Sequence, residues 1–225
     1  SRRESLLDEV RLKCSNPDNI KILPLDLNDF DDAKVKVEKA YDFFGRIDIL
    51  INNAGISQRS LIADTQFDIF KKLINVDYLG TVAISRALLP FFLDQGGGHY
   101  VVVSSVMGKY GSPFRSGYAA AKHALHGFFD SLRPEVARHD IHITLIAPGK
   151  VQTEIGKNAL TETGDPYGKD DRGHAVGLSA DAAAKKIISA IKRKKRQAII
   201  AKWNDIAWLG LFLRKHFPWL YFELA

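Results

Sequence analysis

Short apolar runs rich in β-branched residues alternate with longer helical patterns along this 225-residue chain, and this alternation constrains the fold more than any other feature. The runs are nearly continuous in hydrophobicity, which is typical of parallel strands buried on both faces of a sheet. The helical segments are long enough to connect parallel strands as crossovers. The expected strands span residues 20–25, 47–52, 99–104, 141–146 and 197–201, and the expected helices span 31–44, 65–94, 115–138 and 181–194. The pattern predicts an α/β fold built on a doubly wound parallel sheet.

Length and composition favour a single domain. A chain of this length with 46% hydrophobic residues can bury one substantial core. We expect residues 1–202 to form the α/β domain and residues 203–225 to form a C-terminal tail. The single cysteine, Cys14, permits no intrachain disulfide, so a reducing compartment such as the cytoplasm is expected. The sequence contains no run of 18 apolar residues that would span a bilayer.

Basic residues concentrate near the C-terminus. The net charge is +6, and much of the excess lies in residues 185–196, which we interpret as a solvated helix end. An anionic membrane surface is the weaker alternative, and nucleic acid is not expected, because no nucleic-acid motif accompanies the run. The tail crowds aromatic and leucine side chains around Arg214, Lys215 and His216. It suits peripheral membrane contact or a hydrophobic substrate mouth, and packing against the body or a second subunit is the alternative.

Polar and glycine-containing stretches follow the expected strands. Ligands of doubly wound sheets bind beyond the carboxyl ends of the strands, so these stretches are candidate site residues. They are Asp26, "NNAG" at 52–55, Ser105 and "PGKVQT" at 148–153. Four stretches that are far apart in the chain are therefore predicted to meet at one edge of the sheet.

Tyr118 and Lys122 are four residues apart in an alanine-rich stretch, so they should project from the same face of a helix. A positive charge beside a phenol stabilises the phenolate, and such a tyrosine can exchange a proton with an alcohol or a carbonyl near neutral pH. By itself, such a pair is more often structural, with the ring packed on the core and the lysine reaching solvent.

Over nearly all of its length, the sequence resembles a classical short-chain dehydrogenase/reductase. The motifs that carry the resemblance are "LDL" at 25–27, "NNAG" at 52–55, "NVDYLGT" at 75–81, "SSVMGKYG" at 104–111, "YAAAK" at 118–122 and "PGKVQT" at 148–153. The resemblance implies a Rossmann-like fold and an oxidoreductase that transfers hydride between a nicotinamide cofactor and a carbonyl or secondary alcohol.

The resemblance also implies the catalytic roles. Tyr118 would donate the proton in reduction or accept it in oxidation, and Lys122 would activate it and bind the nicotinamide ribose. Ser105, thirteen residues before the tyrosine, would hydrogen-bond the substrate oxygen and stabilise charge that develops there. Its neighbour Ser104 should point to the other side of the strand. Asn75 would support a water that joins Lys122 to bulk solvent.

Cofactor-binding residues follow from the same resemblance. Those near the adenosine are Asp26, Leu27, Asn53, Ala54 and Gly55, and those that would clamp the nicotinamide are Pro148, Gly149, Val151 and Thr153, beside Tyr118 and Lys122. Arg2 and Arg3 lie at the position where members of the family recognise the adenosine ribose. A guanidinium offers charged, fork-shaped donors to a 2′-phosphate, so we expect NADP(H). A solvated helix start is the alternative for both arginines, although positive charge is disfavoured there.

One part of the family pattern is missing, because the sequence has no G-x-x-x-G-x-G turn. We therefore expect the first strand, this turn and the first helix to lie upstream of residue 1, and residues 20–25 to be detached from 47–52. The retained Asn75, Ser105, Tyr118 and Lys122 favour an oxidoreductase. The missing turn favours the alternative, a catalytically silent scaffold or binding protein that cannot hold the dinucleotide.

The remaining expectations concern ligands and partners. Residues 154–178 occupy the family's substrate-lid position and are polar and glycine-rich, and the substrate is expected to be a small, lipophilic carbonyl or alcohol. His123 and His126 lie three apart on the catalytic helix, but no third ligand accompanies them, so no metal is expected. A homo-oligomer is expected.

Overall fold

A four-stranded parallel sheet forms the centre of the molecule in the computed structural model, which describes residues 1–169 and 176–224. Its strands are β1 (Ile49–Asn52), β2 (Gly98–Val103), β3 (Ile141–Pro148) and β6 (Gln197–Ile200), in the order β1-β2-β3-β6. All three pairings are parallel, and Tyr100 is aligned with Leu50 on one side and Ile143 on the other. The prediction of a parallel α/β sheet is confirmed.

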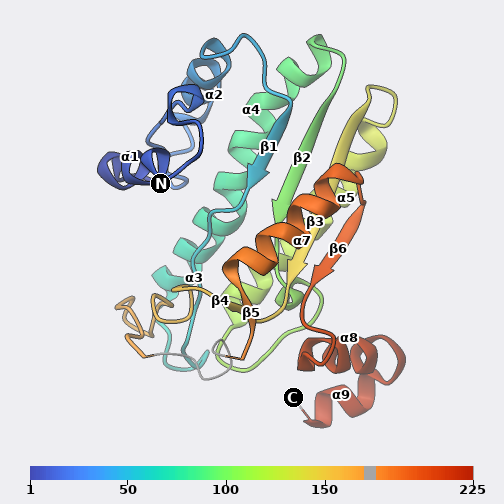
Figure 1. Cartoon of the computed structure of the whole chain (residues 1–225). Coiled ribbons are helices and arrows are strands. Elements are labelled where there is room, and N and C mark those ends of the chain that lie inside the picture. Colours follow the sequence, from blue (N-terminus) through green and yellow to red (C-terminus); the bar gives the residue numbers. More distant parts are fainter. Residues whose placement is uncertain (170–175, 225) are drawn as a thin grey trace.

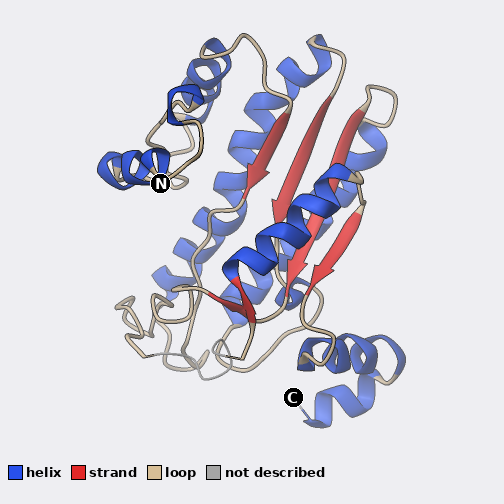
Figure 2. Ribbon diagram, in the orientation of Figure 1, coloured by secondary structure: helices blue, strands red, loops and turns tan. Residues whose placement is uncertain are grey.

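Helices cover both faces of the sheet. Figure 1 shows α4 (Gly80–Asp94) and α5 (Ser116–Glu135) on one face and α7 (Ala180–Lys192) on the other, and Figure 2 shows the same layers by secondary structure. Each face of the sheet has its own hydrophobic core. Successive residues of β2 pack into these two cores in turn, because side chains alternate between the faces along a strand. Tyr100 and Val102 pack in the core beneath α4 and α5, whereas Val101 packs with residues of α7.

A continuous helical run leads into α4. It consists of α3 (Phe67–Ile74), a π-helical turn η2 (Asn75–Leu79) and α4 itself, within the segment predicted to be helical at 65–94. By length and composition, the span Phe67–Asp94 could cross a membrane. Leu73, Leu88 and Phe92 in this span are fully buried within the molecule, so its apolar character is explained by core packing.

The N-terminal part contradicts one strand prediction. It contains α1 (Glu4–Leu12), a short 3-10 turn η1 (Pro17–Asn19) and α2 (Ala33–Asp42), which packs on α4. Residues 20–25 were predicted to form a strand, but they belong to no sheet, and the Leu25 amide instead donates to the Ser1 carbonyl at 2.9 Å. A strand needs a neighbour to pair with, and β1 is the sheet edge, where Ile49 and Ile51 are 46% and 51% exposed.

The C-terminal part begins beyond the carboxyl ends of the strands. A two-stranded parallel pair, β4 (Val151–Gln152) and β5 (Leu178–Ser179), precedes α7. After β6, the chain forms α8 (Ile206–His216) and α9 (Pro218–Leu224), which lie at the lower end of the molecule in Figure 1. This end of the sheet is where the sequence predicts the site.

Candidate active site

Tyr118 and Lys122 lie one turn apart on α5 and are both buried. Tyr118 is 7% exposed and Lys122 is 3% exposed, and the Lys122 Nζ lies 5.5 Å from the centroid of the Tyr118 ring. Ile69, Leu73 and Leu160 pack with the tyrosine. Burial of a lysine is unusual unless its charge is compensated, so the ammonium group indicates a built site rather than a lysine that reaches solvent.

The start of α5 is held by Gln58, which is fully buried. Its Oε1 accepts hydrogen bonds from the amides of Gly117 at 2.8 Å and Tyr118 at 3.4 Å, and its Nε2 donates to the Ser60 hydroxyl at 3.2 Å. These amides belong to the first turn of the helix, where no intrahelical acceptor is available. Gln58 was missed by the sequence analysis, because no motif signals a helix cap that comes from 59 residues earlier in the chain.

Ser105 and Ser104 follow β2 and have different partners. Ser105 precedes the 3-10 turn η3 (Val106–Gly108), and its Oγ accepts from the Met107 amide at 3.1 Å. The Ser104 hydroxyl instead donates to the Lys122 carbonyl at 3.1 Å. That hydroxyl therefore helps to attach α5 to the end of β2, whereas Ser105 remains the candidate for binding the substrate oxygen.

Within the described part of the chain, the Lys122 ammonium has one hydrogen-bond acceptor and one ion-pair partner. The Val103 carbonyl lies 3.4 Å from Nζ, and Asp77 Oδ2 lies 3.5 Å from it. Asp77 is fully buried, and its Oδ1 accepts from the Ile56 amide at 2.7 Å. Burial raises the pKa of Asp77, whereas the positive charge of Lys122 and the hydrogen bond from Ile56 oppose that rise.

Asn75, the expected support of the lysine, is half-buried at the start of η2 and has no side-chain hydrogen bond among the residues that the structure describes. The group from this helix that does contact Lys122 is Asp77. The sequence analysis missed Asp77 although it lies in the quoted "NVDYLGT" stretch. Its signal was an acidic residue four after Leu73 and eight after Ile69, a spacing that continues the apolar face of the helix.

Predicted cofactor residues lie around this cluster and along the open edge of the sheet. A side-chain carbon at Gly55 would lie 3.1 Å from Lys122 Nζ and 3.3 Å from Asp77 Oδ1, so a larger residue here would require these side chains to shift by a few tenths of an ångström. Asn53 and Ala54, just before it, are exposed. Arg2 lies 3.5 Å from Asp26, which brings two of the predicted adenosine contacts together. Leu27 packs beside them against the main core.

The predicted nicotinamide clamp lies between β3 and α8. A side-chain carbon at Gly149 would lie 2.8 Å from Asp205 Oδ2, and the same Oδ2 accepts from the Lys150 amide at 3.1 Å. Asp205 also caps α8 through the Ala207 amide. Pro148 is the last residue of β3, Val151 lies in β4, and Thr153 is exposed beyond it. Asp205 is a further residue that the sequence did not indicate.

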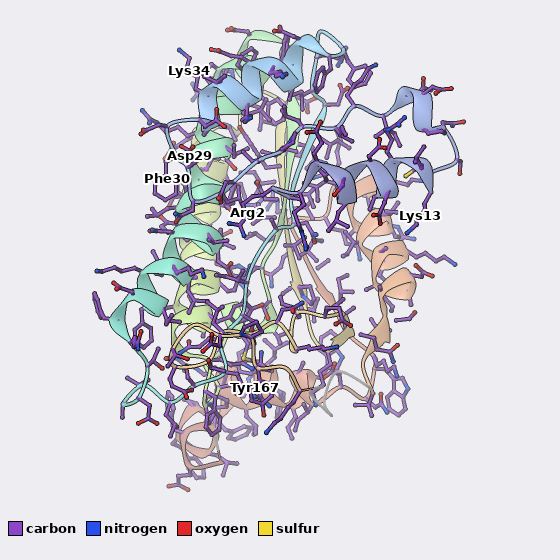
Figure 3. All side chains as sticks on the ribbon, turned by 90° about the vertical axis from the view of Figure 1, so that its left-hand side faces the viewer. Arg2, Lys13, Asp29, Phe30, Lys34 and Tyr167 are labelled. Atoms are coloured by element: carbon purple, nitrogen blue, oxygen red, sulfur yellow. The ribbon has the colours of Figure 1, made fainter. Side chains whose placement is uncertain are left out.

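Part of the expected lid is attached to the loop after β1. Leu160 and Ser57 pair through their backbones, as do Arg59 and Leu160, at 2.8 Å each. Figure 3 labels Tyr167 in these lower loops and Arg2 above them, on the segment that leads into α1. Leu160 contacts the Tyr118 cluster, so the lid position contributes to the wall around the tyrosine. Residues 170–175 of the expected lid lie outside the described residues.

The two histidines of α5 have separate environments. His123 Nδ1 lies 2.8 Å from the Ala119 carbonyl, whereas both ring nitrogens of His126 are buried without a hydrogen-bond partner. Among the described residues, no group of three His, Cys, Asp or Glu side chains is arranged to hold a metal ion.

Comparison with known proteins gives one consistent family. A model for the short chain dehydrogenase family matches residues 1–164. Dehydrogenase/reductase SDR family member 7B from Bos taurus is 44% identical over 181 residues, which cover 80% of this chain and 55% of that protein. The Anopheles gambiae dehydrogenase/reductase SDR family protein 7-like is 40% identical over 228 residues, covering 99% of this chain and 71% of that protein. The chain thus spans between about half and three quarters of the length of these relatives.

Several solved structures share the fold. A short-chain dehydrogenase from Streptomyces avermitilis matches with a TM-score of 0.79 and 26% identity, covering 100% of this chain and 84% of that chain. ElxO with NADP bound matches with a TM-score of 0.65 and 33% identity, over 68% of this chain and 63% of its own. Carveol dehydrogenase from Mycobacterium avium, in complex with NAD, matches with a TM-score of 0.57 and 29% identity, covering 60% of this chain and 50% of that chain.

Proposed function

The chain belongs to the short-chain dehydrogenase/reductase family, and on that premise we propose that the protein transfers hydride between NADP(H) and a carbonyl or secondary alcohol. The observation that carries the proposal is the buried Tyr118–Lys122 pair, with Ser105 following the adjacent strand. The relatives are named dehydrogenases or reductases, which supports the reaction class but leaves the substrate open.

Each residue of the proposed site would have its own role in the reaction. The Tyr118 hydroxyl gives its proton to the carbonyl oxygen in reduction and takes it back in oxidation. The Lys122 ammonium would place its positive charge next to the tyrosine, 5.5 Å from the centre of its ring. Ser105 donates a hydrogen bond to the substrate oxygen, where negative charge develops. The wall of Ile69, Leu73 and Leu160 excludes water from the tyrosine and favours a lipophilic substrate.

The cofactor would lie across the carboxyl ends of β1 and β3. Lys122 would hold the nicotinamide ribose, the Pro148–Thr153 loop the nicotinamide, and the Asn53–Gly55 loop the adenosine, with Arg2, Arg3, Asp26 and Leu27 at its far end. When bound, the nicotinamide supplies the hydride chemistry. Gly55 packs closely on Lys122 and Asp77, and Gly149 packs closely on Asp205, so a side chain at either position would disturb residues that border the proposed cofactor site.

Replacing Tyr118 by Phe tests the proposal. The ring still packs but the exchangeable proton is lost, so turnover should fall by about 10² to 10⁴, the usual contribution of a general acid, with nearly unchanged cofactor affinity. Lys122→Ala should lower both turnover and cofactor affinity. Tyr41→Phe, a tyrosine of α2 that stacks on Phe91, is the matched control and should keep full activity. A Tyr118→Phe variant that retains more than a third of normal kcat would exclude the assigned role.

A cofactor titration separates the oxidoreductase from a silent scaffold. Reduced cofactor fluorescence should change on binding to the protein, and consumption of the reductant should follow when retinals, ketosteroids, quinones or small diketones are screened. Absence of any binding to NADPH or NADH would favour the scaffold. Light scattering on the same samples tests the proposed homo-oligomer, which would be excluded by a monomeric mass at micromolar concentration.

A further inference from the structure

Gln58 is a buried polar side chain that the mechanism above does not use. It lies in the loop after β1 and is fully enclosed, although glutamine is mostly exposed in proteins. Its side-chain oxygen accepts from the amides of Gly117 and Tyr118, so this one atom holds the backbone of the catalytic tyrosine itself. A buried amide group is costly to leave unpaired, which indicates that its position has a function.

The orientation of the Gln58 amide is fixed from the side away from α5. Its Nε2 donates to the Ser60 hydroxyl at 3.2 Å, and the Thr65 hydroxyl donates to the same Ser60 oxygen at 2.7 Å. Ser60 and Thr65 are themselves buried. Because Nε2 can only donate and the backbone amides of α5 can only donate, this chain of hydrogen bonds requires the Gln58 oxygen to face α5.

The backbone on both sides of Gln58 holds the lid position. The Leu160 amide donates to the Ser57 carbonyl, and the Arg59 amide donates to the Leu160 carbonyl, at 2.8 Å each. The Leu160 side chain packs in the same cluster as Tyr118. The lid segment and the catalytic helix are therefore attached to the same loop at the same residue, and Figure 1 shows that loop after β1 at the end of the sheet where the site lies.

The first turn of α5 has little room to move. A side-chain carbon at Gly117 would lie 2.8 Å from Leu73 Cδ1 and 3.1 Å from Gln58 Oε1, so the turn is packed between α3 and the glutamine. Phe114, just before the helix, has a φ of 65°, a left-handed conformation that is unfavourable for a residue other than glycine. Its carbonyl accepts from the Ser60 amide at 3.2 Å. The Gln58 loop thus contacts the chain both before α5 and within its first turn.

We propose that Gln58 is a positioning residue that couples the lid to Tyr118. Its side chain fixes the backbone of the tyrosine and its neighbouring backbone groups hold Leu160, so the docking of the lid and the placement of the phenol depend on one loop. Such placement matters, because a displacement of about 1 Å can cost about 10²-fold in rate. The inference rests on the proposed function of Tyr118, but the coupling itself can be measured without cofactor or turnover.

Two substitutions separate the oxygen of Gln58 from its size. Gln58→Met has a similar length but leaves the amides of Gly117 and Tyr118 without an acceptor. Gln58→Glu keeps an oxygen for them, and its charge is favoured at the start of a helix. In the cofactor-free chain, hydrogen exchange at these two amides and at Leu160 should become about five- to a hundredfold faster in Gln58→Met, as expected when a buried donor loses its partner. It should stay near the unmodified rate in Gln58→Glu.

Turnover gives a second readout. Gln58→Met should lower kcat by about 10- to 100-fold and change the KM for the cofactor by less than about threefold, because the cofactor contacts are not altered. Gln95→Ala is the matched control, since the Gln95 Nε2 donates to the carbonyls of Ile47 and Gly97 at 2.7 Å each, before the amino end of β2. Its loss should lower Tm but leave kcat and the exchange of Leu160 unchanged, which separates positioning from a general loss of stability.

Unchanged exchange at Gly117, Tyr118 and Leu160 in folded Gln58→Met would overturn the proposal, as would equal kcat values for the Met and Glu variants. Faster exchange in a protein that shows no turnover would support the coupling and reject the proposed reaction instead. If Gln58→Met does not fold, the unmodified chain decides. Its amides at Arg59, Leu160, Gly117 and Tyr118 should share one dependence of exchange on denaturant, as in a single cooperative opening, and separate dependences would exclude the coupling.

Discussion

At the scale of single residues, the site contains two ion pairs of opposite character. Lys122 and Asp77 are buried, so each charge depends on the other, and removing one partner of such a pair is strongly unfavourable. Arg2 and Asp26 are exposed, at 76% and 41% of their side-chain surfaces. Exposed pairs typically contribute about 0 to 1 kcal/mol, so Arg2 can exchange Asp26 for another anion at little cost.

This difference underlies our prediction for the cofactor. A guanidinium–phosphate contact of about 1.5 to 3 kcal/mol corresponds to roughly ten- to a hundredfold in affinity, so the protein should prefer NADPH to NADH. Replacing Arg2 by Asp together with Arg3 by Ala should abolish or reverse the preference in fluorescence titrations. Arg11→Ala, which removes an arginine of α1 that pairs with Asp8, should leave the preference unchanged. Equal affinities in the unmodified protein would exclude the role of Arg2 and Arg3.

A second residue prediction concerns His126. Burial lowers the pKa of His126 to about 4, and the nearby Lys109 adds to the effect. The unfolded chain binds this proton near pH 6.5, so the stabilising contribution is complete above that pH and is lost as the pH falls toward 4. His126→Leu removes no hydrogen bond, and it should reduce the loss of unfolding free energy between pH 7.5 and 4.5 by about 2 kcal/mol.

Urea denaturation at several pH values measures this effect. His99 also titrates in this range, because burial lowers its pKa to about 4, so some pH dependence should persist in the His126 variant. The exposed His139 provides the control, and His139→Gln should leave the curve unchanged. A His126→Leu variant with the same pH dependence as the unmodified chain would contradict the prediction.

At the scale of elements, the helical run α3–η2–α4 contacts both residues 25–27 and α5. Its π-helical turn carries Asp77, and its next residue, Gly80, begins α4 against Leu27. A side-chain carbon at Gly80 would lie 2.2 Å from the Leu27 carbonyl oxygen. The close contact explains how residues 25–27 keep their place although they are not part of the sheet.

Gly80→Ala should therefore both destabilise the fold and weaken cofactor binding. Overpacking of this kind usually costs about 1 to 3 kcal/mol, and the backbone that must move carries Asp26 and Leu27. Gly127→Ala on α5 is the matched control, because no atom lies within 4 Å of the added carbon. Alanine is favoured over glycine in helices by about 1 kcal/mol, so this variant should raise Tm by a few degrees. Equal Tm values for both variants would show that the Gly80 contact is not restrictive.

At the scale of the whole molecule, the C-terminal helices pack on the body, which was the alternative expected for the tail, and leave an apolar surface exposed. Ala207 and Tyr221 are buried against Val106 and Tyr110, and the Tyr221 hydroxyl donates to the Gly111 carbonyl, so the tail packs on the body. Leu211 and Leu213 also pack on this cluster, whereas several other apolar side chains are exposed, among them Trp203 at 91%, Ile206, Leu209, Phe212, Trp219 and Phe222. Arg214 and Lys215 lie in the last turn of α8 beside these apolar groups.

We expect this exposed surface to bind anionic vesicles. Each buried aromatic side chain contributes about 1.5 to 3 kcal/mol, so Trp203→Ser with Trp219→Ser should reduce vesicle binding at least about tenfold. Flotation of the whole chain at low salt measures the binding, and high salt should weaken it through Arg214 and Lys215. Phe44→Ser, an exposed aromatic residue near α2, is the control. Unmodified protein that stays off the vesicles at low salt would exclude the membrane contact.

The sequence alone determined the sheet, its crossovers and the Tyr118–Lys122 pair, because each follows from a pattern within a short stretch of the sequence. Strands buried on both faces read as continuous apolar runs, and residues four apart share a helix face whatever surrounds them. The tertiary structure decided the rest. Residues 20–25 have strand-like composition but no neighbour to pair with, and Gln58 and Asp77 act across distances in the chain that no local pattern records. A side chain's role at such a site depends on which buried partner it reaches, and only the packing of the helices against the sheet determines that.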